Sequence, residues 1–182
     1  AIAQELDKTE VMRNILQTSA QTDTITKIKV KLMQVKDIRG TANRVTESQV
    51  LDDIELFELK AFSLLVVEMR ELLLSANITV VSLPDLEPVV DILDPEKMRI
   101  PHFYVYDAYS PELAALRAKM KTLKMDGKTE ERVLDQLLFE HTELEDRIRE
   151  KLSEQIHPYK KEINEALTNT ATLDILLAKA KQ

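Results

Sequence analysis

The sequence predicts an all-α protein in which a helical core carries a long antiparallel helical lever arm. Only two of its 182 residues are Gly and six are Pro, too few for a sandwich or barrel with many turns. Hydrophobic residues make up 44% of the chain, enough for a real core. Apolar residues also recur at three- and four-residue steps through most of the chain, as they do on the buried face of a helix.

Charge and cysteine content exclude several classes of function. The net charge of -7 gives no general attraction to nucleic acid or anionic membranes, so such binding requires a local cationic patch. The absence of Cys removes disulfides, thiol nucleophiles and thiolate metal sites, and it suits a reducing compartment.

Membrane and export signals are also weak. The most apolar window, residues 57–74, is interrupted by charges that include Glu58, Lys60 and Arg70, which argues against a membrane span. Residues 1–10 lack the basic and apolar regions of a secretory signal. We therefore expect a cytoplasmic protein that has no membrane partner.

The first quarter of the chain is expected to contain two helices. Apolar spacing predicts the first over residues 6–16, followed by a polar break at 18–24. Residues 25–35 fit either a strand or a helix, and we favour a helix because no partner strand lies nearby. Gly40 should end this helix, and residues 41–49 should form a polar connection.

The central strut of the core is predicted over residues 51–74, with Asp52 or Asp53 near its start. Its apolar residues cover more than one face, so this helix should contact partners on several sides. Residues 78–99 contain three prolines, and within them residues 86–93 are expected to form a short helix.

Residues 100–123 are expected to join the core to the arm. Four of the eight Phe and Tyr residues of the chain gather here: Phe103, Tyr104, Tyr106 and Tyr109. Ser110 is a suitable N-cap, Pro111 fits the first helical position, and Glu112 complements the helix dipole. The aromatic residues are expected to pack between the core and the arm.

The predicted domains are a helical core, residues 1–109, and the lever helices, residues 110–182. The outgoing helix is expected at 110–125 and the returning helix at 129–181, since Asp126-Gly127 is a strong turn signal.

The returning helix should bend at Pro158, because the proline ring collides with the carbonyl four residues back. Two i,i+4 ion pairs are expected to support it, Glu143 with Arg147 and Glu145 with Arg149.

No catalytic, cofactor or metal site is predicted, and we expect this chain not to be an enzyme. His102, His141 and His157 lack the spacing of a helical metal site. The only glycines are Gly40 and Gly127, so a Gly-rich loop that binds phosphate is absent from this sequence.

One group of cations forms a stripe along a predicted helix. Arg117, Lys121, Lys124 and Lys128 fall on one side of the outgoing helix if that helix continues to Lys128. Such a stripe could contact a DNA backbone, although a solvated helix face is the commoner reason for this pattern.

Several motifs, in order, resemble the core and lever region of the MutS mismatch-repair family, the region called MutS domain III. They are VKDIR at 35–39 with the helix at 51–74, YSPELAAL at 109–116, and LDILLAKA at 173–180, near the end of a stretch, 143–182, that is similar to the returning lever helix. Mismatch-reading members carry a β-rich clamp between the lever helices, where this chain has only a short turn. The closest likeness is therefore a clamp-reduced MutS-related protein.

The resemblance implies a module that transmits motion between a C-terminal nucleotidase and double-stranded DNA. For the full-length protein it implies an ATPase that uses ATP and Mg and forms a homodimer; it implies no cofactor in this chain. The alternative is a stand-alone helical scaffold or adaptor that binds a partner helix and has no DNA role. A small helical enzyme that uses scattered carboxylates is a third class, opposed by the lack of a His or Cys cluster.

Overall fold

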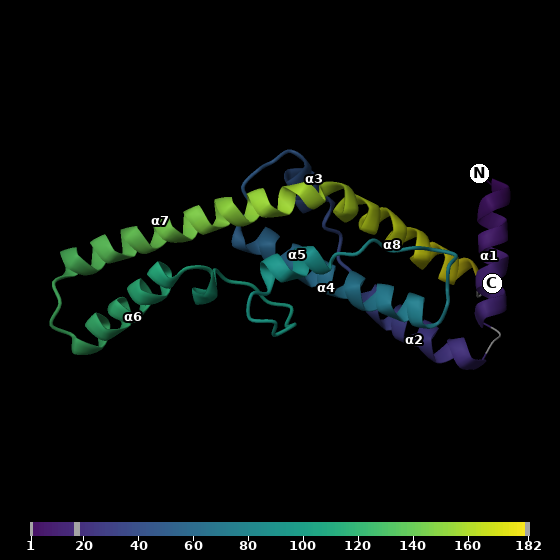
Figure 1. The fold of residues 1–182 in the computed structure, drawn as a ribbon, viewed down its shortest axis with the longest axis horizontal. Coiled ribbons are helices and arrows are strands. Elements are labelled where there is room, and N and C mark those ends of the chain that lie inside the picture. The colour runs from purple at the N-terminus through teal and green to yellow at the C-terminus, as the bar shows by residue number, and fades with distance from the viewer. Residues whose placement is uncertain (1, 17–18, 181–182) are drawn as a thin grey trace.

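The computed structural model describes residues 2–16 and 19–180, and within these residues all regular structure is helical, which confirms the all-α prediction (Figure 1). The elements in order are α1 (Ile2–Leu16), α2 (Ser19–Gln34), α3 (Arg39–Thr46), α4 (Asp53–Ser75), α5 (Glu87–Leu93), the 3-10 turn η1 (Asp107–Tyr109), α6 (Pro111–Asp126), α7 (Glu131–Ile156), the 3-10 turn η2 (His157–Tyr159) and α8 (Lys160–Ala180).

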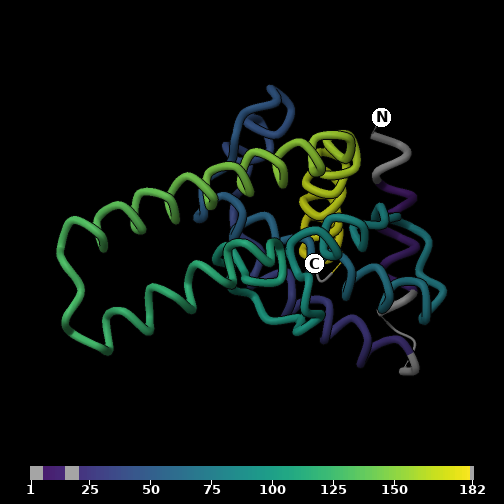
Figure 2. Tube along the Cα trace, turned by 60° about the vertical axis from the view of Figure 1, so that its left-hand side comes forward, coloured from purple at the N-terminus to yellow at the C-terminus, as the bar shows by residue number. Residues whose placement is uncertain are grey.

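The molecule is elongated, with a helical body at one end and a two-helix arm at the other (Figure 1). Helices α1 to α5 and α8 make up the body, while α6 and the first part of α7 run side by side as the arm. Figure 2 shows the same hairpin projecting from the body in a second view. None of the helices in the described part of the chain is both long and apolar enough to cross a membrane.

Helix α4 is the central strut of the body, as the sequence predicts. It begins with a capping box, in which the Asp52 carboxylate accepts a hydrogen bond from the Glu55 N–H and the Glu55 side chain accepts one from the Asp52 N–H. Its buried residues occupy several faces, because α2, α3 and α5 all contact it. Two apolar residues of α4, Ile54 and Leu74, are instead largely exposed.

The helix prediction for residues 25–35 is confirmed as far as Gln34, but the predicted polar break at 18–24 is wrong for residues 19–24, which form the start of α2. Thr18 lies outside the described residues. The Gln21 side chain donates a hydrogen bond to the Ala76 carbonyl across the body, so tertiary contacts support this polar turn of helix.

Gly40 does not end α2, and this prediction is wrong. Helix α2 stops at Gln34, and Gly40 lies inside the short helix α3, which takes up most of the predicted connection at 41–49. Thr41, Ala42 and Val45 of α3 are buried, because α3 packs against α4 and α8. Burial of this face, which the local sequence does not encode, overcomes the weak helix propensity of glycine.

Local signals place the arm helices correctly. The Ser110 hydroxyl accepts a hydrogen bond from the Leu113 N–H at 3.1 Å, and Pro111 is the first residue of α6. Gly127 ends α6 in the left-handed conformation at φ 68°, where a glycine has no steric cost. The predicted short helix at 86–93 is α5.

The returning helix bends at Pro158, where the 3-10 turn η2 separates α7 from α8, as predicted (Figure 1). Helix α8 then runs back across the body and packs against α1. Its residues Leu173, Leu176 and Leu177 are buried in the main hydrophobic core. One helical run, interrupted only by η2, therefore extends from the tip of the arm to the far end of the body.

Candidate functional site: the root of the arm

The predicted cation stripe divides into two parts. Arg117 is held at the root of the arm, where its guanidinium pairs with Asp107 at 2.7 Å and with Glu145 at 3.2 Å. Its carbon Cζ also lies 5.9 Å from the centre of the Tyr104 ring. The guanidinium of Arg117 is therefore occupied by contacts within the chain.

Lys121 and Lys124 are exposed, and neither forms an ion pair within the described part of the chain. They lie beside a groove of about 510 Å³ between α6 and α7, whose apolar lining includes Met120 and Leu138. Lys128 follows the end of α6, so it does not share the helix face of the other three cations.

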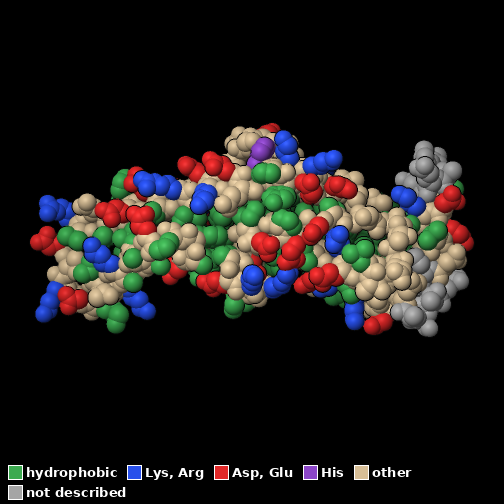
Figure 3. Space-filling model, in the orientation of Figure 1, with side chains coloured by type: hydrophobic (Ala, Val, Ile, Leu, Met, Phe, Trp, Pro, Cys, Tyr) green, Lys and Arg blue, Asp and Glu red, His purple; other side chains and the backbone are tan. Residues whose placement is uncertain are grey.

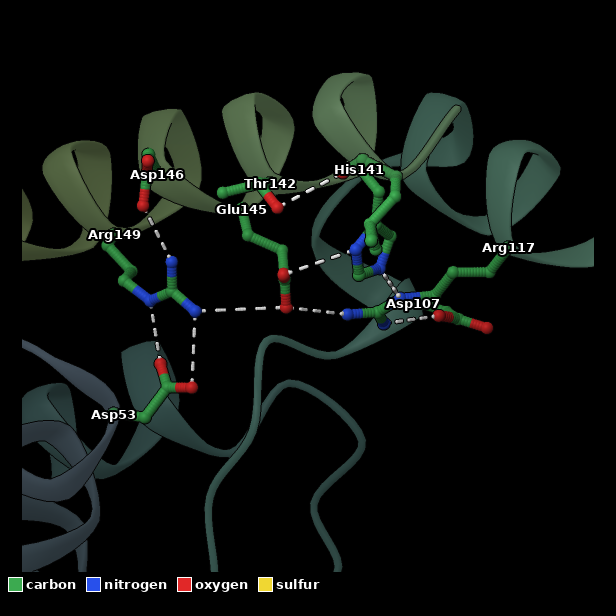
Figure 4. Close-up of polar contacts among 9 residues, drawn as sticks. Asp53, Asp107, Arg117, His141, Thr142, Glu145, Asp146 and Arg149 are labelled. Atoms are coloured by element: carbon green, nitrogen blue, oxygen red, sulfur yellow. Dashed lines mark hydrogen bonds and ion pairs between the residues drawn. The ribbon is translucent and has the colours of Figure 1, made fainter. Parts of the chain in front are cut away.

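Glu145 of α7 is the centre of a polar network that connects the arm to the body (Figure 4). Its carboxylate accepts from Arg117 and lies 3.3 Å from the His141 Nδ1 and 3.8 Å from the Arg149 guanidinium. The predicted Glu145–Arg149 pair is thereby confirmed. The other predicted pair, between residues 143 and 147, is not among the ion pairs of the described residues.

Arg149 completes the connection to the body. Its Nε and Nη2 donate to the two carboxylate oxygens of Asp53 in α4, at 2.7 and 3.2 Å, and its Nη1 donates to Asp146 at 2.8 Å. The hydrogen bonds to Asp53, and the charges of Asp53, Glu145 and Asp146, raise the pKa of Arg149. Charges of alternating sign thus run from α4 through α7 to α6.

His141 takes part in this network as a neutral ring. The Arg117 Nε–H donates to the His141 Nε2 at 3.0 Å, which requires that nitrogen to carry a lone pair. The ring proton is therefore assigned to Nδ1, which faces Glu145. This tautomer lets one imidazole connect the side chains of both arm helices.

A second, buried polar cluster holds the segment that leads into the arm. Lys60 of α4 is 1% exposed, and its Nζ donates to the His102 carbonyl at 2.9 Å and to the Tyr106 hydroxyl at 3.0 Å. Asp94, which is 4% exposed, lies 3.6 Å from the same nitrogen. Tyr109 donates from its hydroxyl to a backbone carbonyl of α5 at 2.7 Å. The predicted aromatic packing between core and arm is present.

Sequence reasoning missed Lys60 as a structural residue and used it only as a charge that interrupts an apolar window. The available signal was its spacing, since Lys60 lies one turn after Leu56 and one turn before Ser63 and all three are buried. A charged residue in the middle of a buried face requires polar partners, and these come from residues 94–106.

The bend between α7 and α8 is also anchored. The His157 Nδ1 lies 2.8 Å from the Val45 carbonyl of α3, and Asn164 donates to the Thr46 hydroxyl at 3.0 Å. On the other side of the bend, the Ser153 hydroxyl accepts from the Leu51 N–H at 2.9 Å. These contacts fix the bend against α3 and the start of α4.

Metal-ligating side chains and glycines were the sequence signals for a metal or phosphate site, and the structure places both. Within residues 2–16 and 19–180, no group of three or more His, Asp and Glu side chains could hold a metal ion. Gly40 lies in α3 and Gly127 caps α6, and neither is in a loop before a Lys-Ser or Lys-Thr pair.

No model of a known protein family matches the chain, and no curated protein is significantly similar to it. The likeness to the MutS family stays a prediction from the motifs.

Proposed function

We propose that the chain is the core and lever segment of a MutS-related DNA-repair ATPase, in which it couples a C-terminal nucleotidase domain to DNA binding by lever motion. The segment performs no chemistry itself. It moves as one body and carries a change at one end of α8 to the tip of the arm.

The observation that carries this proposal is the single helical run from α7 through η2 to α8. Its one end forms the arm and its other end is buried in the body against α1. An adaptor needs an exposed binding face, but it does not need an element that joins its two extremities.

Three sets of contacts support transmission as a rigid body. The network around Glu145 ties both arm helices to α4, Lys60 holds the segment that enters α6, and His157 holds the bend. We infer that these polar contacts select one arrangement of the packed elements. The exit angle of the arm is therefore fixed at three points.

The arm can be tested as a rigid lever by paired spin labels, because the chain contains no Cys. Cysteines introduced at Met125, at the arm tip, and at Met33, on α2, are accessible, since these side chains are 79% and 86% exposed. We expect one narrow distance distribution that duplex DNA does not change. Glu145→Gln should broaden it, whereas Glu154→Gln, an exposed α7 control, should not. A broad distribution in the parent protein would contradict the lever.

The DNA role predicts that binding depends on Lys121 and Lys124 and falls steeply with salt. Replacing both by Gln should weaken duplex binding, while Lys119→Gln, elsewhere on α6, should have a smaller effect. Absent or salt-independent binding would favour the adaptor. The reading frame beyond Gln182 is the second test, because a phosphate-binding loop there would support the ATPase and a stop codon would favour the adaptor.

A further inference from the structure

Helix α4 has an uncovered apolar stripe on the side where α2 stops. The stripe follows one face of the helix at the spacing i, i+3, i+7, i+11 and consists of Ile54, Phe57, Ala61 and Leu65. Ile54 is 72% exposed, and the other three residues are half-buried. The stripe lines a mostly apolar groove of about 300 Å³, the α4 groove, whose opposite wall contains Gln34, Lys36 and Ile38.

This stripe differs from ordinary surface exposure of apolar residues. Apolar side chains reach the surface along the length of the molecule, where they lie among Lys, Arg, Asp and Glu side chains (Figure 3). Scattered exposure of this kind needs no partner. Four apolar positions in one helical row are the pattern through which one α-helix packs onto another. The α4 groove therefore has the form of a helix-packing surface.

The α4 groove lies where α2 would continue if that helix were longer. Helices α2 and α4 run antiparallel, since the Gln21 side chain bonds to the Ala76 carbonyl and Lys31 pairs with Glu68. Helix α2 ends at Gln34, which lines the groove. The apolar stripe is about 16 Å long, at 1.5 Å rise per residue, so it offers room for about three turns of a further helix.

We propose that the α4 groove binds an amphipathic α-helix of a partner protein, which lies end to end with α2 and packs on α4 as α2 does. The bound helix runs in the direction of α2, because its positive N-terminal end then faces the negative C-terminal end of α2. The opposite direction would bring two negative helix ends together. This inference does not rest on the proposed DNA role.

Two charges at the rim define the partner further. Lys36 follows the end of α2 and Glu58 lies on α4, and neither has an ion pair within the described part of the chain. An acidic residue in the first turn of the bound helix would pair with Lys36 and would also complement the dipole of its own helix. A basic residue about two turns later would pair with Glu58, because Glu58 lies about 10 Å along α4 from Leu65.

The middle of the stripe sets the size of the central contact. Ala61 has a small side chain, so the groove has space there for a large apolar residue of the partner. A nucleic acid fits this surface poorly, since phosphates would leave the apolar floor uncovered and Glu58 balances the charge of Lys36. The partner is therefore a helix that is acidic at its start, basic about two turns later and apolar along one face.

Fluorescence anisotropy of the 182-residue chain with a labelled, stapled helical peptide tests the proposal. The probe peptide has about 14 residues, with Leu along one face, Glu in the first turn and Arg about two turns later. The control peptide has the same composition, with Glu and Arg exchanged. We expect the probe to bind with a Kd of about 10 µM and the control to bind at least about tenfold more weakly.

Variants of the chain locate the contact. I54E and A61W should each weaken binding of the probe at least about tenfold, because one puts a charge on the stripe and the other fills the groove. L74E is the matched control, since Leu74 is also exposed on α4 but lies outside the groove, and it should leave binding unchanged. The double variant K36E/E58K should reverse the preference, so that the control peptide binds more tightly than the probe.

Three results would overturn the proposal: no binding of either peptide at about 1 mM, equal binding of both peptides, or probe binding that I54E leaves unchanged. Sedimentation equilibrium without peptide tests the other occupant. A dimer that I54E dissociates would assign the groove to a second copy of the chain and would also overturn the proposal. Duplex binding through Lys121 and Lys124 is measured separately, so each of these failures leaves the proposed function untouched.

Discussion

Replacing Lys60 by Met should lower the free energy of unfolding by about 3 kcal/mol, because removing one partner of a buried ion pair costs roughly 3–5 kcal/mol. We expect the lower end of this range for two reasons. Asp94 keeps two hydrogen bonds from the backbone N–H groups of Met98 and Arg99, at 3.1 and 3.0 Å. The Lys60 Nζ also lies 3.6 Å from the Asp94 oxygen, longer than a charge-assisted hydrogen bond.

Thermal unfolding followed by far-UV circular dichroism measures this loss. For a chain of 182 residues, about 3 kcal/mol corresponds to a fall in Tm of roughly 6–12 °C. Lys151→Met, at an exposed position of α7, is the matched control and should change Tm little. A fall below about 2 °C for Lys60→Met would refute the argument that this ammonium group holds the joint.

Three further predictions concern the glycines, a buried phenol and the apolar face of α7. In urea titrations, Gly127→Ala should lower the free energy of unfolding by about 1 kcal/mol because φ is 68° there, whereas Gly40→Ala should raise it by about 0.5–1 kcal/mol inside α3. A change in the same direction for both variants would contradict this prediction. Burial raises the pKa of Tyr109, so the folded state keeps this proton when the unfolded state has lost it, and stability should fall as pH rises above about 10. Tyr109→Phe should cost about 1 kcal/mol at neutral pH and flatten that fall; an unchanged alkaline slope would contradict the assignment. Leu152→Asn should cost at least about 3 kcal/mol and exceed the cost of Leu144→Asn, because Leu152 is 3% exposed and Leu144 is only half-buried; unchanged melting of both variants would contradict the packing of this face of α7.

Features fixed by a few neighbouring residues were predictable from the sequence. Ser110 and Pro111 locate the start of α6, Gly127 locates its end, and Pro158 locates the bend. Each acts through its own backbone geometry or through a hydrogen bond to a residue three positions away, so the local sequence contains the whole signal.

Features that depend on distant segments were not predictable in the same way. Gly40 reads as a helix end, yet it lies in a helix because α3 packs on α8, far along the chain. The pairing of Arg149 with Asp53 joins residues 96 positions apart, and no spacing rule connects them. The sequence correctly placed the stripe of cations on α6 up to Lys124, but it could not show that Arg117 would form an ion pair with Asp107.

The angle at η2 sets where the arm tip lies relative to the body. Pro158 has no N–H to donate, so the helical ladder is weakest there, and the contacts of His157 and Ser153 with the body have to hold this angle. Helix α7 has 26 residues and is about 39 Å long, so each degree of bend displaces its distal end by about 0.7 Å. A change of ten degrees, which is small for packed helices, would move Lys124 and its neighbours by about 7 Å, more than the length of a lysine side chain. The contacts of His157 with α3 therefore control the position of the arm tip, because the displacement for a given change of angle grows with the length of α7.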